Sequence, residues 1–187
     1  MNYREAILAE KIDEYKIQHR IFYQSLSSMI FDIAFLQACV DLQDYDLNYD
    51  LITVKMLHRN IFDNLISKVY RCFFDKTSGA TNIIIFKSLV IGRYLKAEHR
   101  KEINDKVKEL PIFSSEYKNN KFKDLEKNCR DLRHSFIGHR LLATEDNAII
   151  DLDDIRKLVD YGCELFQVLS FEPSDFYSFL EGDGYDF

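Results

Sequence analysis

Apolar residues recur along the chain at the three- and four-residue spacing of amphipathic helices. Four such stripes are present, and each is suited to bury one face of a helix against the others. Asp50 precedes the second stripe as a helix N-cap, and residues 45–49 and 76–81 are expected to form loops. The pattern predicts an all-α fold, an antiparallel bundle of about five helices. The stripes are Leu26, Met29, Ile33, Leu36 and Val40; Val54, Leu57, Ile61, Leu65, Val69 and Cys72; Phe122, Leu125, Cys129, Leu132 and Phe136; and Ile155, Val159, Gly162, Phe166 and Leu169, led by the acids Asp151, Asp153 and Asp154.

The apolar run from Ile83 to Phe86 fits two kinds of element. Its three consecutive β-branched residues suit a buried strand. The run continues to Leu95 without a turn and no partner strands are evident, so its length favours a helix. A charged, helix-favouring stretch follows from Glu98 to Leu110, and Pro111 ends it.

Composition places the chain among ordinary globular proteins. Hydrophobic residues make up 47% and charged residues 30%, which is typical of neither disordered nor membrane proteins. No apolar run approaches the ~20 residues that span a bilayer, and the N-terminus lacks the apolar stretch of a signal peptide. We expect a cytoplasmic protein with one helical domain, residues 1–172, and an acidic, mobile tail, residues 173–187.

Net charge limits the partners of the chain. The formal charge of −6 argues against broad, sequence-independent binding to a nucleic acid duplex. Five acids and no base lie from Glu172 onward, however, so the body is almost neutral and is compatible with a local basic pocket.

The sequence offers no recognisable metal or cofactor site. Its four cysteines form no C-x-x-C pair, and we interpret them as buried, reduced thiols. His134 and His139 are five residues apart, not four, and no acid completes a zinc-binding set. Phosphate-binding glycine loops and G-x-S-x-G are also lacking, so no cofactor is expected. The cysteines are Cys39, Cys72, Cys129 and Cys163.

Two arginines precede a histidine by six residues, Arg133 before His139 and Arg93 before His99. Spacing alone does not distinguish the two pairs. Gly138 interrupts the helical pattern just before His139, which lets this histidine turn back toward the arginine. The second pair has no break before its histidine, so we interpret Arg93 and His99 as surface residues.

The segment from Arg133 to His139 resembles the R-x(4–6)-H signature of the HEPN superfamily, in which a polar residue often follows the arginine, as His134 does here. The layout from about residue 20 to residue 170 is similar to the abortive-infection U-type branch. That branch has a long N-terminal helical region, a segment like Phe62 to Tyr70, an apolar helix, the motif and a last helix.

The residue types suit RNA cleavage without a metal. A guanidinium such as that of Arg133 matches the charge that develops on a phosphate, and a histidine such as His139 moves protons near neutral pH. His134 is a candidate to orient the substrate or share proton transfer. The resemblance implies a homodimer acting on an RNA substrate in bacterial defence or a toxin–antitoxin pair, with an antitoxin or defence-system partner protein. Leu141 stands where toxins paired with nucleotidyltransferases carry a tyrosine, so that subtype is not expected.

Two other functions remain open. The chain is alternatively a non-catalytic HEPN module that binds a nucleotide, RNA or a protein partner, with the acidic tail as a contact segment. It is otherwise an interaction protein in which the motif is a coincidence. In that case Arg133 pairs with Asp131 or an acid of the last helix, and His139 bonds a free carbonyl at a helix end. Arg130 and Arg140 extend the basic surface without a catalytic role.

Overall fold

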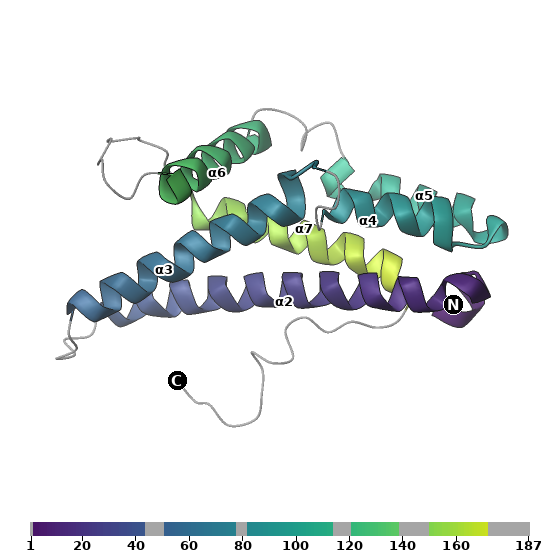
Figure 1. Ribbon diagram of the computed structural model, residues 1–187, viewed down its shortest axis with the longest axis horizontal. Coiled ribbons are helices and arrows are strands. Elements are labelled where there is room, and N and C mark those ends of the chain that lie inside the picture. The colour runs from purple at the N-terminus through teal and green to yellow at the C-terminus, as the bar shows by residue number, and fades with distance from the viewer. Residues whose placement is uncertain (1, 44–50, 78–81, 114–120, 139–149, 172–187) are drawn as a thin grey trace, which may run out of the picture.

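The computed structural model describes residues 2–43, 51–77, 82–113, 121–138 and 150–171, and these residues form an all-α fold, as predicted (Figure 1). The described residues contain seven α-helices rather than about five, and the four-residue helix at Tyr3–Ala6 is one that the apolar pattern did not indicate. None of these helices combines the length and apolar character needed to cross a membrane. The α-helices are α1 (Tyr3–Ala6), α2 (Ile12–Gln43), α3 (Leu51–Val69), α4 (Ile83–Leu89), α5 (Ala97–Glu109), α6 (Lys121–Gly138) and α7 (Leu152–Ser170); η1 (Ala9–Lys11) and η4 (Pro111–Phe113) are 3-10 helices, and η2 (Tyr70–Phe74) and η3 (Val90–Tyr94) are π-helices.

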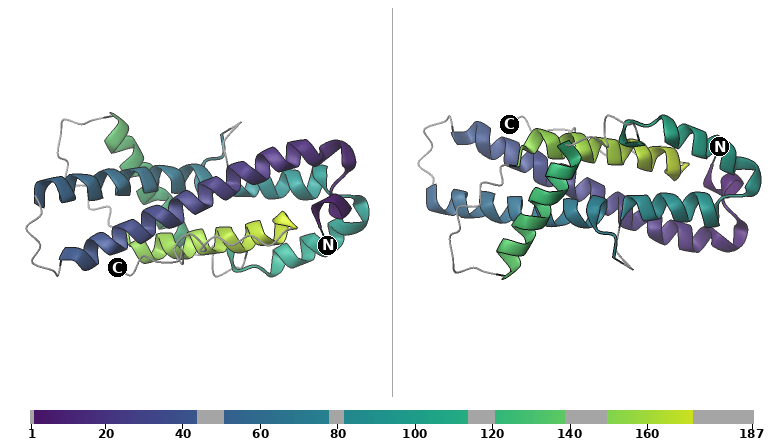
Figure 2. Two further views of the ribbon diagram at one scale, coloured as in Figure 1. Left: turned by 90° about the horizontal axis from the view of Figure 1, so that it is seen from below. Right: turned by 90° about the horizontal axis from the view of Figure 1, so that it is seen from above.

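The long helix α2 runs the length of the molecule, and the other elements are arranged along it (Figure 1). Helices α3 and α7 both contact α2 and run antiparallel to it. The shorter α4 and α5 lie at the end of the bundle where the N-terminus also lies. Helix α6 differs from the rest because it crosses α3 instead of running along it, and it contacts both α3 and η2 (Figure 2).

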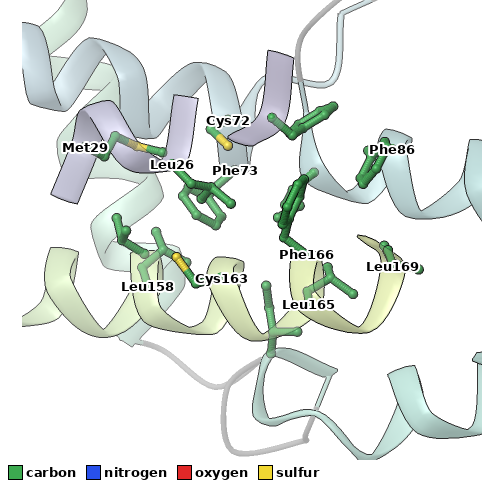
Figure 3. Close-up of a cluster of buried hydrophobic side chains, with 14 of the residues drawn as sticks. Leu26, Met29, Cys72, Phe73, Phe86, Leu158, Cys163, Leu165, Phe166 and Leu169 are labelled. Carbon is green, nitrogen blue, oxygen red and sulfur yellow. The ribbon is translucent and has the colours of Figure 1, made fainter. Parts of the chain in front are cut away.

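The core lies between α2, α7 and the segments that join α3 to α4. All five residues of the fourth predicted stripe are buried in α7, and Asp151 caps this helix by accepting a hydrogen bond from the backbone N–H of Asp153 at 2.9 Å. Aromatic rings fill the space between the helices (Figure 3). The ring of Phe86 lies 4.7 Å from that of Phe22 and 6.0 Å from that of Phe166.

The second predicted stripe is buried only in its second half. Leu65, Val69 and Cys72 have relative exposures of 2% or less, whereas Leu57 is 46% exposed. The prediction for Leu57 is therefore wrong. The reason is that the first turns of α3 extend beyond α6 and α7, so that, of the described helices, only α2 lies alongside them (Figures 1 and 2).

The apolar run from Ile83 to Phe86 is a helix, as its length indicated. Ile83 and Phe86 are buried and the two isoleucines between them are exposed, which is the three-residue spacing of a helix face. Asn82 caps the helix, since its side-chain oxygen accepts a hydrogen bond from the backbone N–H of Ile84 at 2.8 Å.

The helical structure is interrupted between Arg93 and His99, where no interruption was expected. The π-helix η3 ends at Tyr94, Leu95 and Lys96 are extended, and α5 begins at Ala97. The extended residues pair with the N-terminal segment, which explains the break. Leu95 forms an antiparallel bridge with Ile7, and the N–H of Lys96 donates to the carbonyl oxygen of Ala6 at 3.0 Å.

A polar cluster joins α2 to α3 beside the core. The Lys68 Nζ donates to Oδ2 of Asp32 at 2.6 Å and also to the hydroxyl of Ser28. Asp32 is only 7% exposed, and a carboxylate this buried requires a cationic partner. Lys68 belongs to the Phe62 to Tyr70 segment, so this segment fixes the register of α3 on α2.

All four cysteines are buried and free, as predicted. Burial raises the pKa of Cys72 and of Cys129 to about 12 and raises that of Cys163 further. Thiols with such pKa values are weak nucleophiles at neutral pH, so their role is packing.

Several predictions fall outside the described residues. These are the Asp50 cap, the loop at 45–49, and the tail at 173–187. Within the loop predicted at 76–81, Lys76 and Thr77 are described and are not helical.

Candidate active site around Arg133

Helix α6 carries Arg133 at the edge of its buried face. Leu125 and Cys129 are buried and Leu132 is half-buried, so the third stripe packs α6 against α3 and η2. Arg133 follows Leu132 directly and is therefore turned about 100° from it around the helix. The guanidinium consequently lies where α6 meets η2. The Arg133 side chain is 28% exposed.

The Arg133 guanidinium makes two contacts with the two ends of η2. Its Cζ lies 4.9 Å from the centre of the Tyr70 ring. Its Nη1 lies 3.9 Å from Oδ2 of Asp75. A cation–π contact at a partly exposed site contributes about 0.5–1 kcal/mol, so this arrangement orients the guanidinium more than it stabilises the fold.

Asp75 is itself held in place. Its Oδ1 accepts hydrogen bonds from the Thr77 backbone N–H at 3.0 Å and from the Thr77 hydroxyl at 2.7 Å. Its carbonyl oxygen accepts from Nδ2 of Asn82 at 3.0 Å. The two bonds from Thr77, together with the nearby charges of Arg133 and Arg71, lower the pKa of Asp75. Asp75 is therefore ionised at neutral pH and available to the guanidinium.

The π-helix η2 brings Tyr70 and Asp75 to one side of the chain. In an α-helix, residues five apart point roughly 140° away from each other. Here the Asp75 N–H donates to the Tyr70 carbonyl oxygen at 2.8 Å, which is the hydrogen bond of a π-turn. Tyr70 and Asp75 consequently both reach Arg133 on the crossing helix.

The predicted site residues are described to different extents. Arg133 is placed with its side chain. His134 lies within α6, but its side chain is not described, and His139 and Arg140 lie outside the described residues. The grouping of Arg133 with the two histidines thus remains a prediction.

The ion-pair partner of Arg133 within the described part of the chain is Asp75, not Asp131 or an acid of the last helix. Asp131 instead lies 3.7 Å from Nε of its neighbour Arg130. Sequence reasoning missed Asp75 and Tyr70. Tyr70 could have been singled out, because it is the last residue of the segment that resembles the HEPN layout. Asp75 could not, because no local sequence signal marks the π-turn that brings it beside Tyr70.

The second arginine–histidine pair has a different environment. Arg93 is exposed, as predicted. His99 is partly buried, with 24% of its side chain exposed and Nε2 3.3 Å from Glu98 Oε1. Among the residues whose positions are described, no group of three or more His, Cys, Asp or Glu side chains is arranged to hold a metal ion.

The fold and the motif define the class of the protein, an all-α protein of HEPN type. The HEPN family described as AbiU2 (HEPN_AbiU2) matches residues 46–185, which is most of the chain. The chain belongs to this family, an abortive-infection family of HEPN type. No curated protein and no solved structure matches the chain significantly.

Proposed function

We propose that the protein is a metal-independent endoribonuclease of HEPN type that acts in bacterial defence or a toxin–antitoxin system. One observation carries the proposal: the Arg133 guanidinium contacts Tyr70 and Asp75 while 28% of the Arg133 side chain stays exposed. A fixed, solvent-reachable guanidinium is the group that a phosphate requires. Membership of the AbiU2 family supports the setting in abortive infection.

The reaction begins with attack of an RNA 2′-hydroxyl on the adjacent phosphorus. His139 takes the hydroxyl proton as the new P–O bond forms, and the P–O5′ bond breaks as the leaving oxygen receives a proton from the protonated His139, or from a protonated His134 that shares the transfer. The products are a 2′,3′-cyclic phosphate and a 5′-hydroxyl. Arg133 stabilises the charge on the phosphorane, and His134 orients the substrate or shares the proton transfer.

A homodimer completes this site in our proposal. Two copies that meet at α6 gather two Arg133 side chains and their histidines round one phosphate. Such a dimer is cytoplasmic and is controlled by an antitoxin or another defence protein.

Cleavage of mixed tRNA and mRNA by the purified protein, with EDTA present, tests the proposal. We expect the wild type to cut, and we expect both Arg133→Ala and His139→Ala to lose cutting while their thermal melts stay unchanged. Cleavage that persists in both folded variants would remove Arg133 and His139 from the mechanism.

One observation favours a second function, a non-catalytic HEPN module. Asp75 already balances part of the charge of Arg133, which leaves less positive charge to stabilise the phosphorane of the transition state. A module of this kind binds a nucleotide, RNA or a protein partner and forms no product. Binding of labelled RNA that depends on Arg133, without any cleavage over hours, is the result that this function predicts.

A further inference from the structure

The orientation of Arg133 depends on contacts of two different kinds. The Arg133 guanidinium lies over the Tyr70 ring, with Cζ 4.9 Å from the ring centre, which is a cation–π contact. The Asp75 carboxylate, whose Oδ2 lies 3.9 Å from Nη1, attracts the guanidinium by its charge. The two contacts together restrict the guanidinium from two directions, the ring face and the carboxylate.

Both contacts come from positions that cannot easily shift. Tyr70 opens the π-helix η2, whose Phe73 is 8% exposed and packs in the core (Figure 3). Asp75 closes that π-helix and is held through Oδ1 by Thr77 and through its carbonyl oxygen by Asn82, which is 3% exposed. Because its anchor uses Oδ1, the Oδ2 atom stays directed to Arg133.

We propose that Tyr70 and Asp75 are positioning residues that hold the Arg133 guanidinium ready for an RNA phosphate. This inference rests on the proposed function of the site. The Tyr70 ring sets the plane of the guanidinium, the anchored Asp75 carboxylate occupies one edge, and the remaining edge takes the phosphate oxygens.

The Asp75 charge should also weaken RNA binding, and this second effect gives the proposal a distinctive test. A carboxylate beside the guanidinium repels a phosphate that approaches the same group. Asp75 therefore weakens RNA binding while it orients Arg133 for the transition state. Loss of its charge should tighten RNA binding and slow cleavage at the same time, a combination that a merely structural role does not produce.

The decisive experiment compares Asp75→Asn with Asp131→Asn in steady-state cleavage of one RNA. Asparagine keeps the shape of Asp75 and an oxygen for Thr77, and we expect kcat to fall about tenfold and KM to fall about threefold. Asp131 is a matched control on α6, because it pairs with Arg130 and is 46% exposed. Its variant should keep both constants within about twofold of the wild type.

A second pair of variants tests the ring. Tyr70→Phe keeps the aromatic face and should retain wild-type kcat, whereas Tyr70→Leu should lower kcat about tenfold. If Asp75→Asn does not fold, Thr77→Val replaces it. This exposed substitution removes the hydroxyl that anchors Asp75 and should lower kcat in the same direction.

The outcomes separate the two proposals. An active wild type whose kcat and KM do not change in Asp75→Asn overturns the positioning role and leaves the proposed function intact. An inactive wild type overturns the proposed function, and the carboxyl titration of Asp75 by NMR then tests the contact directly. Arg133→Ala should raise the pKa of Asp75, and an unchanged titration would show that the two groups do not interact.

Discussion

Two π-helices in this molecule have the same local form and different uses. In η2 the N–H of Asp75 donates to the carbonyl oxygen of Tyr70 at 2.8 Å, and in η3 the N–H of Leu95 donates to that of Val90 at 2.9 Å. Each π-helix is associated with one of the two arginine–histidine pairs: Arg133 contacts η2, and Arg93 lies within η3. Asp75, directly after η2, pairs with Arg133, whereas Leu95, directly after η3, pairs with Ile7 of the N-terminal segment.

The difference shows that spacing in the sequence does not make a site. Arg93 is six residues before a histidine, as Arg133 is, and it lies within a π-helix. It is exposed, and the buried residues beside it, Tyr94 and Leu95, anchor the chain rather than the guanidinium. The contacts that Arg133 makes where α6 crosses η2, and not the spacing of the motif, distinguish the two arginines.

Replacement of the two arginines should give the largest contrast. Arg133→Ala removes the charge that stabilises the phosphorane, and we expect cleavage to fall about 10²–10³-fold. Arg93→Ala removes an exposed side chain and should leave cleavage within about twofold. Initial rates on one RNA substrate, with melting curves as the control for folding, measure both. Equal losses in the two variants would contradict the distinction.

Glycines beside the two π-helices should differ in stability. A Cβ at Gly162 would lie 2.7 Å from Cζ of Phe73 in η2, whereas a Cβ at Gly92 in η3 would meet nothing within 4 Å. Gly162→Ala should destabilise the fold by about 1–3 kcal/mol, because the buried Phe73 ring must shift. Gly92→Ala should be neutral or stabilising by up to about 1 kcal/mol. Urea unfolding of both variants measures the difference, and a neutral Gly162→Ala would show that the core around η2 yields easily.

The N-terminal contact of η3 should matter for stability and not for cleavage. Asn2 caps α1, since Oδ1 accepts hydrogen bonds from the N–H groups of Arg4 at 2.9 Å and Glu5 at 3.1 Å. Asn2→Ala should cost about 1 kcal/mol locally. Faster hydrogen exchange at Leu8 and Lys96, with unchanged RNA cleavage, is the expected result. A large loss of cleavage would indicate that this end of the bundle serves the site after all.

The smallest expected effect is on the stability of the fold at low pH. The pKa of Asp75 is lowered in the folded protein, first by its bonds to Thr77 and further by Arg133. The contribution of Asp75 to stability is therefore present above its unfolded pKa, near 3.8, and is lost as pH falls through the lower folded value. Asp75→Asn should lack this acid-sensitive contribution, while Asp131→Asn should melt like the wild type between pH 2 and 7. If the melting temperature falls with pH in the same way in the wild type and in both variants, the ionised state of Asp75 in the folded protein is contradicted.

Elements governed by local pattern could be predicted from the sequence. The buried stripe of α7 follows from apolar spacing, and the helix at Ile83 follows from the length of its apolar run. The exposure of Leu57 could not be predicted in the same way, because spacing does not say where the covering helices end.

The parts that escaped prediction depend on distant residues. The break at Leu95 exists because residues near Ile7 pair with it, and the setting of Arg133 exists because α6 crosses η2. A π-turn has no strong residue signature of its own, so its position follows from packing and not from local propensity. The motif therefore indicated which arginine to examine, but not the residues that hold it.

The ends of the RNA fragments give the most direct test of the central claim, which is attack by the 2′-hydroxyl without a metal. Fragments produced in EDTA should carry 2′,3′-cyclic phosphates and 5′-hydroxyls, which mass spectrometry identifies, and Arg133→Ala should produce almost none. Fragments with 5′-phosphates and 3′-hydroxyls, or cleavage that stops when EDTA is added, would contradict the mechanism.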